Sequence, residues 1–253
     1  MRWSPALRQF GTLFARPIAH RGLHDRAAGI IENTRSAFAA AMAGDYAIEC
    51  DLQVSADGEA MVFHDSKLDR LMRETGSLRS LTADEIRKAT FKAGRDRIQT
   101  LDEMLTQVDG KVPLVIEIKS HFLDADTTLV QRAADVLAGY TGTHALMSFD
   151  PDILEAIGRY APDVPRGIVT DRTTHPEYKA LPYTRRLELR HFTHLERTRP
   201  DFISYDWKGL PYPPVTAFRE AGNPVISWTI REPAAAAKAL RYSDQITFEG
   251  FRA

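Results

Sequence analysis

The sequence has little of several features that define whole classes of protein. It has one cysteine, so an internal disulfide is impossible, and 33 basic and 34 acidic residues leave a net charge of −1. Such a balance favours neither nucleic acid nor an anionic membrane as a partner. No apolar run approaches the roughly 18 residues of a membrane span, and the N-terminus lacks the apolar core of a signal peptide. We therefore expect a soluble, cytoplasmic protein with no integral membrane segment and no nucleic-acid partner.

The single cysteine, Cys50, lies between Glu49 and Asp51 in an apolar stretch. Side chains alternate along a strand, so the cysteine should point away from both acids. This position predicts a buried, small hydrophobic residue rather than a nucleophile.

With 253 residues, 43% of them hydrophobic, the chain can bury a full core without a disulfide or a structural metal. Near the N-terminus, Trp3, Leu7, Phe10 and Phe14 follow helical spacing. This pattern fits an interfacial membrane helix or a short helix packed under the protein's own domain. Packing is the favoured interpretation, because the apolar face is short and only modestly basic.

The stretch from Tyr46 to Asp65 predicts a hairpin that brings acids and a histidine together. Asp57-Gly58 between two apolar runs is a strong turn signal. Alternation on a strand places Glu49 and Asp51 on one face. If Asp57 and Gly58 are the two central turn residues, Asp51 pairs with His64. We therefore expect a potential metal ligand to face an imidazole across this hairpin.

Eight short apolar runs alternate with stretches typical of helices, the pattern of βα units around a parallel sheet. The runs begin near Pro17, Ala47, Leu114, Ala145, Arg166, Phe202, Val225 and Gln245. Residues 60–64 are not counted: parallel neighbours need a crossover of a dozen or more residues, so a segment after a tight turn must run antiparallel. The sequence thus predicts a (β/α)8 barrel, the TIM barrel, as a single domain over residues 1–253.

Nearly fifty residues separate His64 from the next barrel strand, too many for one simple connection. Capping boxes at Thr82 with Glu85 and at Thr100 with Glu103 indicate two helices in this part of the chain. We expect a small helical insertion at about residues 65–111, after the second strand and its hairpin.

Titratable side chains gather at the carboxyl ends of the predicted strands, where the active sites of such barrels lie. They are His20, Arg21, Glu49, Asp51, His64, Glu117 and Lys119, with Trp228 nearby. Three carboxylates repel one another unless they are protonated or bridged by a cation, and oxygen ligands select a hard ion such as Mg²⁺ or Ca²⁺. Each residue alone has an ordinary structural explanation, but convergence from separate strands indicates acid–base chemistry on an anionic substrate.

These residues form a series of short motifs spread over nearly the whole chain. The motifs are His20-Arg21-Gly22, Glu32-Asn33-Thr34, Glu49-x-Asp51, Asp57-Gly58 with His64-Asp65, Glu117-Ile118-Lys119, Ser148-Phe149 and Trp228-Thr229. In this order and at this spacing, the chain resembles the glycerophosphodiester phosphodiesterases. The resemblance implies hydrolysis of a small-molecule glycerophosphodiester to sn-glycerol 3-phosphate and an alcohol.

The resemblance also implies roles for individual residues. His20 and His64 would act as general acid and base, in an order that the sequence does not show. Arg21 would bind the phosphate, Lys119 would support the anionic site, and Trp228 would line the substrate pocket.

By the same resemblance, Glu49, Asp51 and Glu117 would hold one divalent cation, Mg²⁺ or Ca²⁺. A mechanism that fits uses the ion to lower the pKa of the glycerol 2-hydroxyl. One histidine would remove that proton and the other would protonate the departing alcohol, giving a cyclic phosphate that water opens.

The chain departs from the family's pattern at three positions. Ile31 replaces a proline before the Glu-Asn-Thr run, and Glu249 ends a Thr-Phe-Glu run where the family has Thr-Asp. Neither change removes the expected chemistry. Arg231 stands where the family often has asparagine, and it could favour a more anionic leaving group or cap a helix.

Residues 172–199 are rich in arginine and histidine and could dock on an anionic lipid surface. The interleaved acids Glu177, Glu188 and Glu196 break the positive run, which favours an ordinary solvated barrel helix.

Two other functions fit the same residues. One is a lysophospholipase D-like phosphodiesterase that acts on lipids. The other is a non-catalytic phosphate-binding barrel, which the complete set of histidines, arginine and acids disfavours. The preferred alcohol and the oligomeric state do not follow from the sequence.

Overall fold

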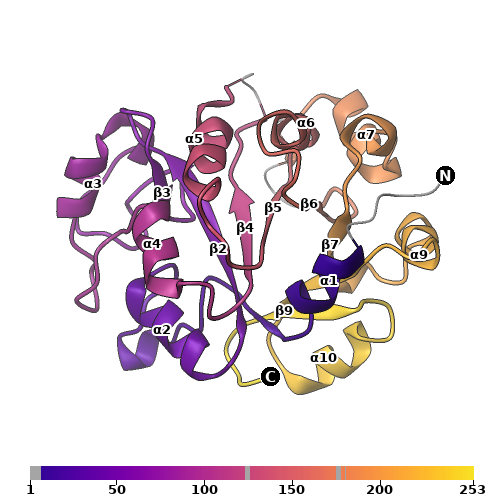
Figure 1. The fold of residues 1–253 in the computed structure, drawn as a ribbon, viewed down its shortest axis with the longest axis horizontal. Coiled ribbons are helices and arrows are strands. Elements are labelled where there is room, and N and C mark those ends of the chain that lie inside the picture. The colour runs from indigo at the N-terminus through magenta and orange to yellow at the C-terminus, as the bar shows by residue number, and fades with distance from the viewer. Residues whose placement is uncertain (1–6, 123–125, 175–177, 180) are drawn as a thin grey trace.

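Eight parallel strands close into a barrel in the computed structural model, which describes residues 7–122, 126–174, 178–179 and 181–253 (Figure 1). The strands are β1 (Ile18–Ala19), β2 (Ala47–Val54), β4 (Leu114–Ile118), β5 (His144–Ser148), β6 (Arg166–Thr170), β7 (Phe202–Asp206), β8 (Val225–Ile230) and β9 (Gln245–Phe248). The short β1 pairs with β2 on one side and with β9 on the other, which closes the barrel. Each strand begins within one residue of its predicted start, so the predicted (β/α)8 barrel is confirmed.

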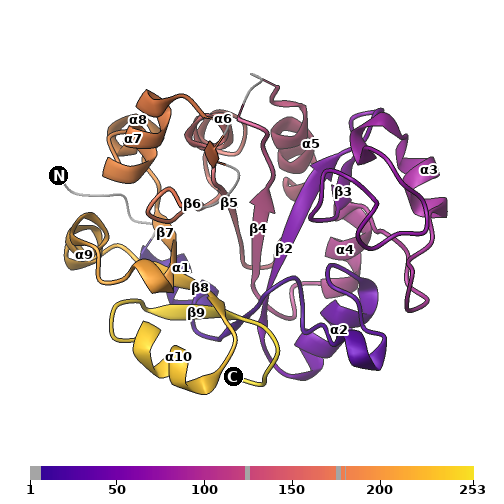
Figure 2. The same ribbon diagram turned by 180° about the vertical axis from the view of Figure 1, so that it is seen from behind.

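Helices follow the strands and cover the outside of the barrel (Figures 1 and 2). They are α1 (Leu7–Leu13), α2 (Arg35–Ala43), α3 (Ala83–Lys88), α4 (Leu101–Val108), α5 (Thr128–Leu137), α6 (Pro151–Tyr160), α7 (Tyr183–His191), α8 (Leu195–Thr198), α9 (Pro213–Glu220) and α10 (Pro233–Ala239). Proline opens three of them, at Pro151, Pro213 and Pro233, where its missing N–H sacrifices no hydrogen bond. Among the described residues, no helix has the length and apolar character needed to cross a membrane.

Alternation along the strands separates an apolar floor inside the barrel from a polar rim above it. The floor consists of buried side chains from successive strands, namely Ile18, Ala47, Val115, Ala145, Met147, Val169, Phe202 and Ile226. Two residues further along their strands, the same inward face carries His20, Glu49 and Glu117. Intervening residues such as Cys50 face the surrounding helices and are buried there, as predicted for this cysteine. The acids therefore point into the barrel mouth.

The N-terminal helix α1 closes the floor from below. Leu13 and Phe14 are buried with the barrel's inner side chains, and the Phe14 ring meets Phe202 edge-on at 5.1 Å between centroids. The Gln245 side chain also donates a hydrogen bond to the Phe14 carbonyl, 3.1 Å away. The described part of this segment thus packs on the protein's own underside, while Trp3 lies outside the described residues.

The strand β3 (Ala60–Val62) runs antiparallel to β2, as predicted, but its register differs by one residue. Leu52 pairs with Val62. Continuing the ladder, the Phe63 N–H donates to the Asp51 carbonyl at 3.0 Å. The predicted pairing of Asp51 with His64 is therefore wrong.

Ser55 and Gly58 explain the shift. Ser55 and Glu59 close the hairpin through a hydrogen bond from the Ser55 N–H to the Glu59 carbonyl, 3.0 Å, which leaves three loop residues instead of two. Gly58 occupies the last loop position with a φ of +83°, the left-handed conformation that three-residue hairpin loops require. The Ser55 hydroxyl supports the loop by accepting from the Glu59 N–H at 2.8 Å.

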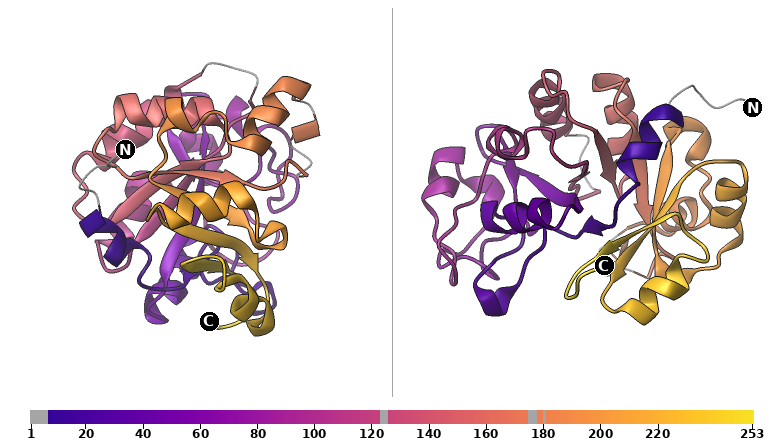
Figure 3. Two further views of the ribbon diagram at one scale, coloured as in Figure 1. Left: turned by 90° about the vertical axis from the view of Figure 1, so that its right-hand side faces the viewer. Right: turned by 60° about the horizontal axis from the view of Figure 1, so that its bottom comes forward.

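The excursion after β3 has an apolar core of its own, which includes Phe63, Leu68, Met72, Ile86 and Ile98. It lies across the molecule from the orange and yellow C-terminal helices (Figures 1 and 3). Both expected capping boxes are present, at the starts of α3 and α4. The helix α4 packs with the barrel core rather than with the excursion. We propose that the excursion is a side layer of one barrel domain and that its core ends at Ile98.

Candidate active site

A cavity of about 180 Å³ opens at the carboxyl ends of the strands. Its wall contains seven of the eight predicted site residues, namely His20, Arg21, Glu49, His64, Glu117, Lys119 and Trp228. The eighth, Asp51, is buried behind Lys119, whose ammonium group lies 2.8 Å from the Asp51 Oδ1 atom. The structure thus brings all eight residues together.

Three buried carboxylates form the centre of this site. Oxygen atoms of Glu49, Asp51 and Glu117 lie within 4.8 Å of one another, and the register of β2 and β4 places Asp51 directly beside Glu117. Burial, followed by the charges of Asp51 and Glu117, raises the pKa of Glu49 well above its usual range. An all-oxygen, buried and mutually repelling donor set fits a hard divalent cation.

Lys119 partly balances these acids. Its ammonium group contacts Glu117 as well as Asp51. Burial opposes its charge, but the two carboxylates outweigh burial and raise the pKa of Lys119. Burial likewise opposes the charge of Asp51, yet Lys119, His64 and Arg21 lower its pKa well below the usual range. Asp51 is therefore the carboxylate that stays ionised most firmly.

Arg21 reaches the pocket through a sharp turn after β1. Arg21 and Gly22 have φ values of 55° and 76°, and a Cβ atom on Gly22 would lie only 2.8 Å from the Ala37 carbonyl carbon. Glycine is therefore required at position 22. The turn directs the Arg21 N–H to the Glu49 carboxylate at 2.8 Å, and the guanidinium lies 2.6 Å from Glu32 and 3.2 Å from Asp51.

His20 is held between two carboxylates. Its Nδ1 atom lies 2.5 Å from the Glu249 Oε2 atom, and its Nε2 atom lies 3.9 Å from Glu49. Burial lowers the pKa of His20, although the hydrogen bond with Glu249 opposes this effect. Because a carboxylate can only accept, Nδ1 donates to Glu249 and the neutral ring presents a lone pair at Nε2.

His64 has a similar arrangement. Its Nδ1 atom lies 2.7 Å from the neighbouring Asp65 carboxylate, and Gln53 donates to its backbone carbonyl at 2.8 Å. Phe63 is buried in the core of the excursion, and the next residue, His64, lines the pocket. The two predicted proton-transfer groups therefore share one cavity despite the shifted hairpin.

Three further residues, Asn33, Glu32 and Arg70, support the site from behind, although no individual role in the site was predicted for them. The Asn33 amide donates to Asp51 at 2.8 Å and accepts from the Asp51 N–H at 3.3 Å. Glu32 binds both Arg21 and Arg70, and these cations overcome burial to lower its pKa to about 2. The Glu32-Asn33-Thr34 run is a sequence signal for the first two, whereas nothing in the sequence marked Arg70.

Glu249 was expected only as a departure from the family's pattern. Ala19 pairs with Phe248 in the barrel ladder, so the following residues, His20 and Glu249, lie side by side. Alternation from Gln245 through Thr247 could have indicated that Glu249 faces inward. Arg231 binds the outer oxygen of Glu249, with its Nε atom 2.7 Å from Oε1, and lines the cavity rather than capping a helix.

The opposite wall of the cavity is mainly apolar. Met147, Phe149, Val169 and Trp228 line it, and the Trp228 ring meets Phe149 at 5.5 Å between centroids. The indole N–H donates to the Ser204 carbonyl at 3.1 Å, which fixes the ring.

Two arginines of the basic segment after β6 are held in ion pairs with acids of the same face. Arg185 contacts Asp150, Asp152 and Glu188 at 2.6–2.8 Å, and Arg197 contacts Asp152, Glu155 and Glu188 at 2.5–3.0 Å. These pairs support the interpretation as a barrel helix, although Glu177 lies outside the described residues.

A barrel whose mouth combines buried acids, two histidines and an arginine has the features of a phosphodiester-cleaving enzyme. The model of the glycerophosphoryl diester phosphodiesterase family matches residues 20–245, so the chain belongs to that family. It is accordingly an enzyme of the glycerophosphodiester phosphodiesterase class, as the sequence motifs predicted.

Individual proteins show the same relationship. The chain is 40% identical to a glycerophosphodiester phosphodiesterase of Caldanaerobacter subterraneus over 41% of this chain and 44% of that protein. It is 25% identical to YhdW of Bacillus subtilis, a candidate glycerophosphodiester phosphodiesterase, over 87% and 88% of the two chains. An Oleispira antarctica phosphodiesterase, solved in complex with the product sn-glycerol-3-phosphate, shares the fold with a TM-score of 0.77, 20% identity and 94% coverage of both chains.

Proposed function

We propose that this enzyme hydrolyses water-soluble glycerophosphodiesters to sn-glycerol 3-phosphate and an alcohol, using one divalent cation and two histidines. The observation that carries the proposal is the shared pocket, in which buried Glu49, Asp51 and Glu117 lie beside His20 and His64. The Oleispira antarctica enzyme of the same fold was solved with sn-glycerol-3-phosphate, which supports the product assigned here.

Glu49, Asp51 and Glu117 would hold the cation, either Mg²⁺ or Ca²⁺. When bound, such an ion supplies positive charge that withdraws electrons from phosphate oxygens and lowers the pKa of a nearby hydroxyl. The raised pKa of Glu49 supports this assignment, because a cation would relieve the repulsion that contributes to it.

The chain's own groups would orient the phosphate and move protons. Arg21 lines the pocket, and its carboxylate partners keep the guanidinium charged and directed. Glu249 and Asp65 each fix the Nδ1 side of one histidine, so both rings would exchange protons at Nε2. One ring would take the proton of the glycerol 2-hydroxyl, and the other would protonate the leaving alcohol.

The shape of the site supports a soluble substrate over a lysolipid. The cavity of about 180 Å³ is smaller than the pockets of about 300–1,000 Å³ that enclose drug-sized ligands. Large hydrophobic side chains that are exposed among the described residues are Tyr160, Tyr183 and Leu240, near the ends of three different helices. A contiguous apolar surface for an acyl chain would require more exposed hydrophobic side chains, lying next to one another.

A panel of glycerophosphodiesters assayed with and without a chelator tests this proposal. We expect turnover of glycerophosphocholine, glycerophosphoethanolamine and glycerophosphoglycerol, its loss in EDTA, and its return with Mg²⁺ or Ca²⁺. Faster turnover of micellar lysophosphatidylcholine than of glycerophosphocholine would contradict the soluble-substrate assignment. Full activity on an analogue without the glycerol 2-hydroxyl would rule out the cyclic-phosphate route.

A further inference from the structure

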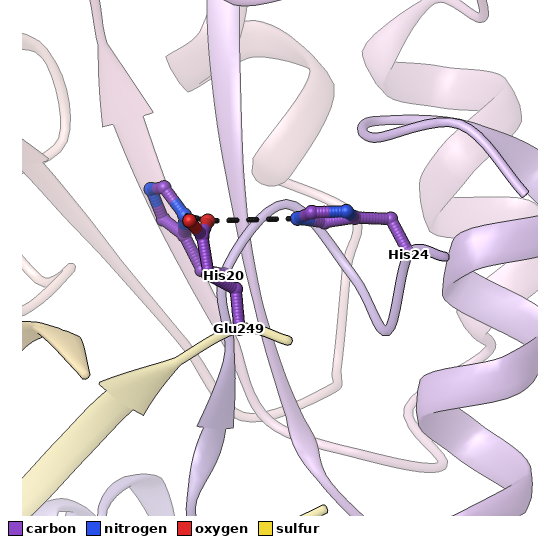
Figure 4. Close-up of side chains that lie close together, drawn as sticks. All are labelled: His20, His24 and Glu249. Atoms are coloured by element: carbon purple, nitrogen blue, oxygen red, sulfur yellow. Dashed lines mark hydrogen bonds and ion pairs between the residues drawn. The ribbon is translucent and has the colours of Figure 1, made fainter. Parts of the chain in front are cut away.

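A second group of potential metal ligands lies beside the pocket, on the outer side of His20. One ring nitrogen of His20, one of His24 and a carboxylate oxygen of Glu249 lie within 4.8 Å of one another (Figure 4). This group differs in chemistry from the three-carboxylate site, because two of its three donors are imidazole nitrogens. Imidazole suits Zn²⁺ and other borderline transition ions, whereas Mg²⁺ and Ca²⁺ prefer oxygen.

The three side chains already point at a common position. In Figure 4 both imidazole rings face the Glu249 carboxylate from opposite sides. The Oε2 atom lies 2.5 Å from His20 Nδ1 and 3.6 Å from His24 Nε2. Tetrahedral zinc ligands at about 2.0–2.2 Å from the ion lie roughly 3.3 Å apart, so side-chain shifts of about 1 Å would accommodate it.

His24 has no other evident function in this position. Its Nε2 atom is buried from solvent and makes no hydrogen bond with any described residue. Its nearest partner, the Glu249 Oε2 atom at 3.6 Å, is too distant for a hydrogen bond, so the buried nitrogen recovers little of the solvation it has lost. Coordination of a cation by this lone pair would satisfy it.

Glu249 is also oriented as a ligand that binds through one oxygen. Arg231 holds the Oε1 atom at 2.7 Å and leaves Oε2 directed at the two rings. Such a partner on the outer oxygen is typical of metal-binding carboxylates. Arg231 also opposes the cation by its charge, but its side chain is 62% exposed, so water screens that repulsion.

We propose that His20, His24 and Glu249 form a second cation site for Zn²⁺ or a similar borderline ion, and that occupation of this site inhibits the enzyme. The ion would replace the proton that His20 shares with Glu249, and the proton of the metal-bound ring would then sit on Nε2. A neutral ring protonated at Nε2 has no lone pair there to accept a proton and is a much weaker acid than imidazolium. The inhibition rests on the proposed role of His20, whereas the binding does not.

The experiment compares wild type with His24→Gln and with His191→Gln, a control that removes an exposed histidine on α7. At saturating Mg²⁺, we expect His24→Gln to keep basal turnover of glycerophosphocholine and to need at least tenfold more Zn²⁺ for half-inhibition. The control should match wild type. Equal Zn²⁺ sensitivity in all three proteins would overturn the proposal.

Co²⁺ absorption supplies a readout that is independent of activity. With Mg²⁺ in excess, wild type and His191→Gln should give the intense visible bands of four- or five-coordinate Co²⁺ with nitrogen ligands, and His24→Gln should not. If no protein hydrolyses glycerophosphodiesters but these spectra differ as expected, the proposed function fails and the site stands. Identical spectra in wild type and His24→Gln would refute the site whatever the activity.

Discussion

Each of the two pocket histidines has one ring nitrogen fixed by a carboxylate. A substrate whose alcohol departs as a stable anion should need only the histidine that acts as general base, because such a leaving group requires no proton. We expect His20→Ala and His64→Ala each to slow glycerophosphocholine hydrolysis by about 10²- to 10⁴-fold, since each removes a proton-transfer group. On a glycerol phosphodiester of p-nitrophenol, whose anion departs without protonation, the variant that lacks the general acid should recover most of its kcat. Steady-state kinetics of both variants on both substrates makes the comparison.

The control for this pair is His191→Ala, which should leave both reactions unchanged because His191 is exposed on α7. Wild-type turnover of glycerophosphocholine by either pocket variant would show that the corresponding ring moves no proton.

A third histidine, His194, links folding to pH. Burial lowers its pKa to about 4, while an unfolded chain titrates near 6.5. Between these pH values the unfolded state binds more protons than the folded state. The contribution of His194 to the free energy of unfolding is therefore fully present above about pH 6.5 and is lost as the pH drops toward 4. We expect a loss of up to about 2 kcal/mol between pH 7 and pH 5 from this residue alone.

Urea denaturation of wild type and His194→Gln at pH 7 and pH 5 measures this contribution. The variant is expected to be less stable at pH 7 but to lose less on acidification, because glutamine does not titrate. If the two proteins lost equal stability, buried His194 would not be the source.

At the scale of single elements, we expect the short helix α1 and the residue after it, Phe14, to contribute to stability rather than to membrane binding. Phe14 is buried against Phe202, so Phe14→Ala should lower the free energy of unfolding by about 3–5 kcal/mol. Phe10→Ala should cost less, because Phe10 is only partly buried. Neither wild type nor the variants should sediment with anionic vesicles. Vesicle binding that Phe14→Ala abolished, at unchanged stability, would instead support an interfacial helix.

Elements were predictable from the sequence to different degrees. The eight strands were predictable, because each apolar run is short and bounded by polar residues. Each run also lies next to a stretch with helical features, which leaves too few residues for the run itself to be a helix. The register of the hairpin was not. It depends on whether Asp57-Gly58 forms a two-residue turn or ends a three-residue loop, and hydrogen bonds of Ser55 with Glu59 and Asp57 favour the latter. That preference is a matter of side-chain bonding, which apolar patterning does not contain.

For the molecule as a whole, the cation should act as a stabilising ligand. Glu49, Asp51 and Glu117 come from two neighbouring strands and repel one another, so an ion that binds only the folded state stabilises it. At 100 times its dissociation constant the gain is about 2.7 kcal/mol. For a chain of this size, that corresponds to a rise in Tm of roughly 5–11 °C.

Differential scanning calorimetry with Mg²⁺, with Ca²⁺ and with EDTA tests this expectation. Glu117→Gln should lose most of the ion-dependent shift, and Glu196→Gln, an exposed control, should keep it. An unchanged Tm in wild type on adding either ion would argue against the carboxylate site.

Closure of the barrel also limits what sequence can reveal about the site. Residues on β1, β2 and β4 could be grouped because they end successive strands. The contact of His20 with Glu249 arises only because the last strand returns to the first, across 229 positions of sequence. Asn33 and Arg70 join the site through loops whose course no periodicity records.

The two halves of the pocket wall come from different arcs of the barrel. The reactive groups lie on or next to β1, β2, β3, β4 and β9, whereas Met147, Phe149, Val169 and Trp228 lie on or next to β5, β6 and β8. Substitutions on the second arc can reshape the space for the alcohol without moving a proton-transfer group or a carboxylate. Descendants of one ancestral barrel could therefore acquire different substrate specificities while inheriting the same chemistry.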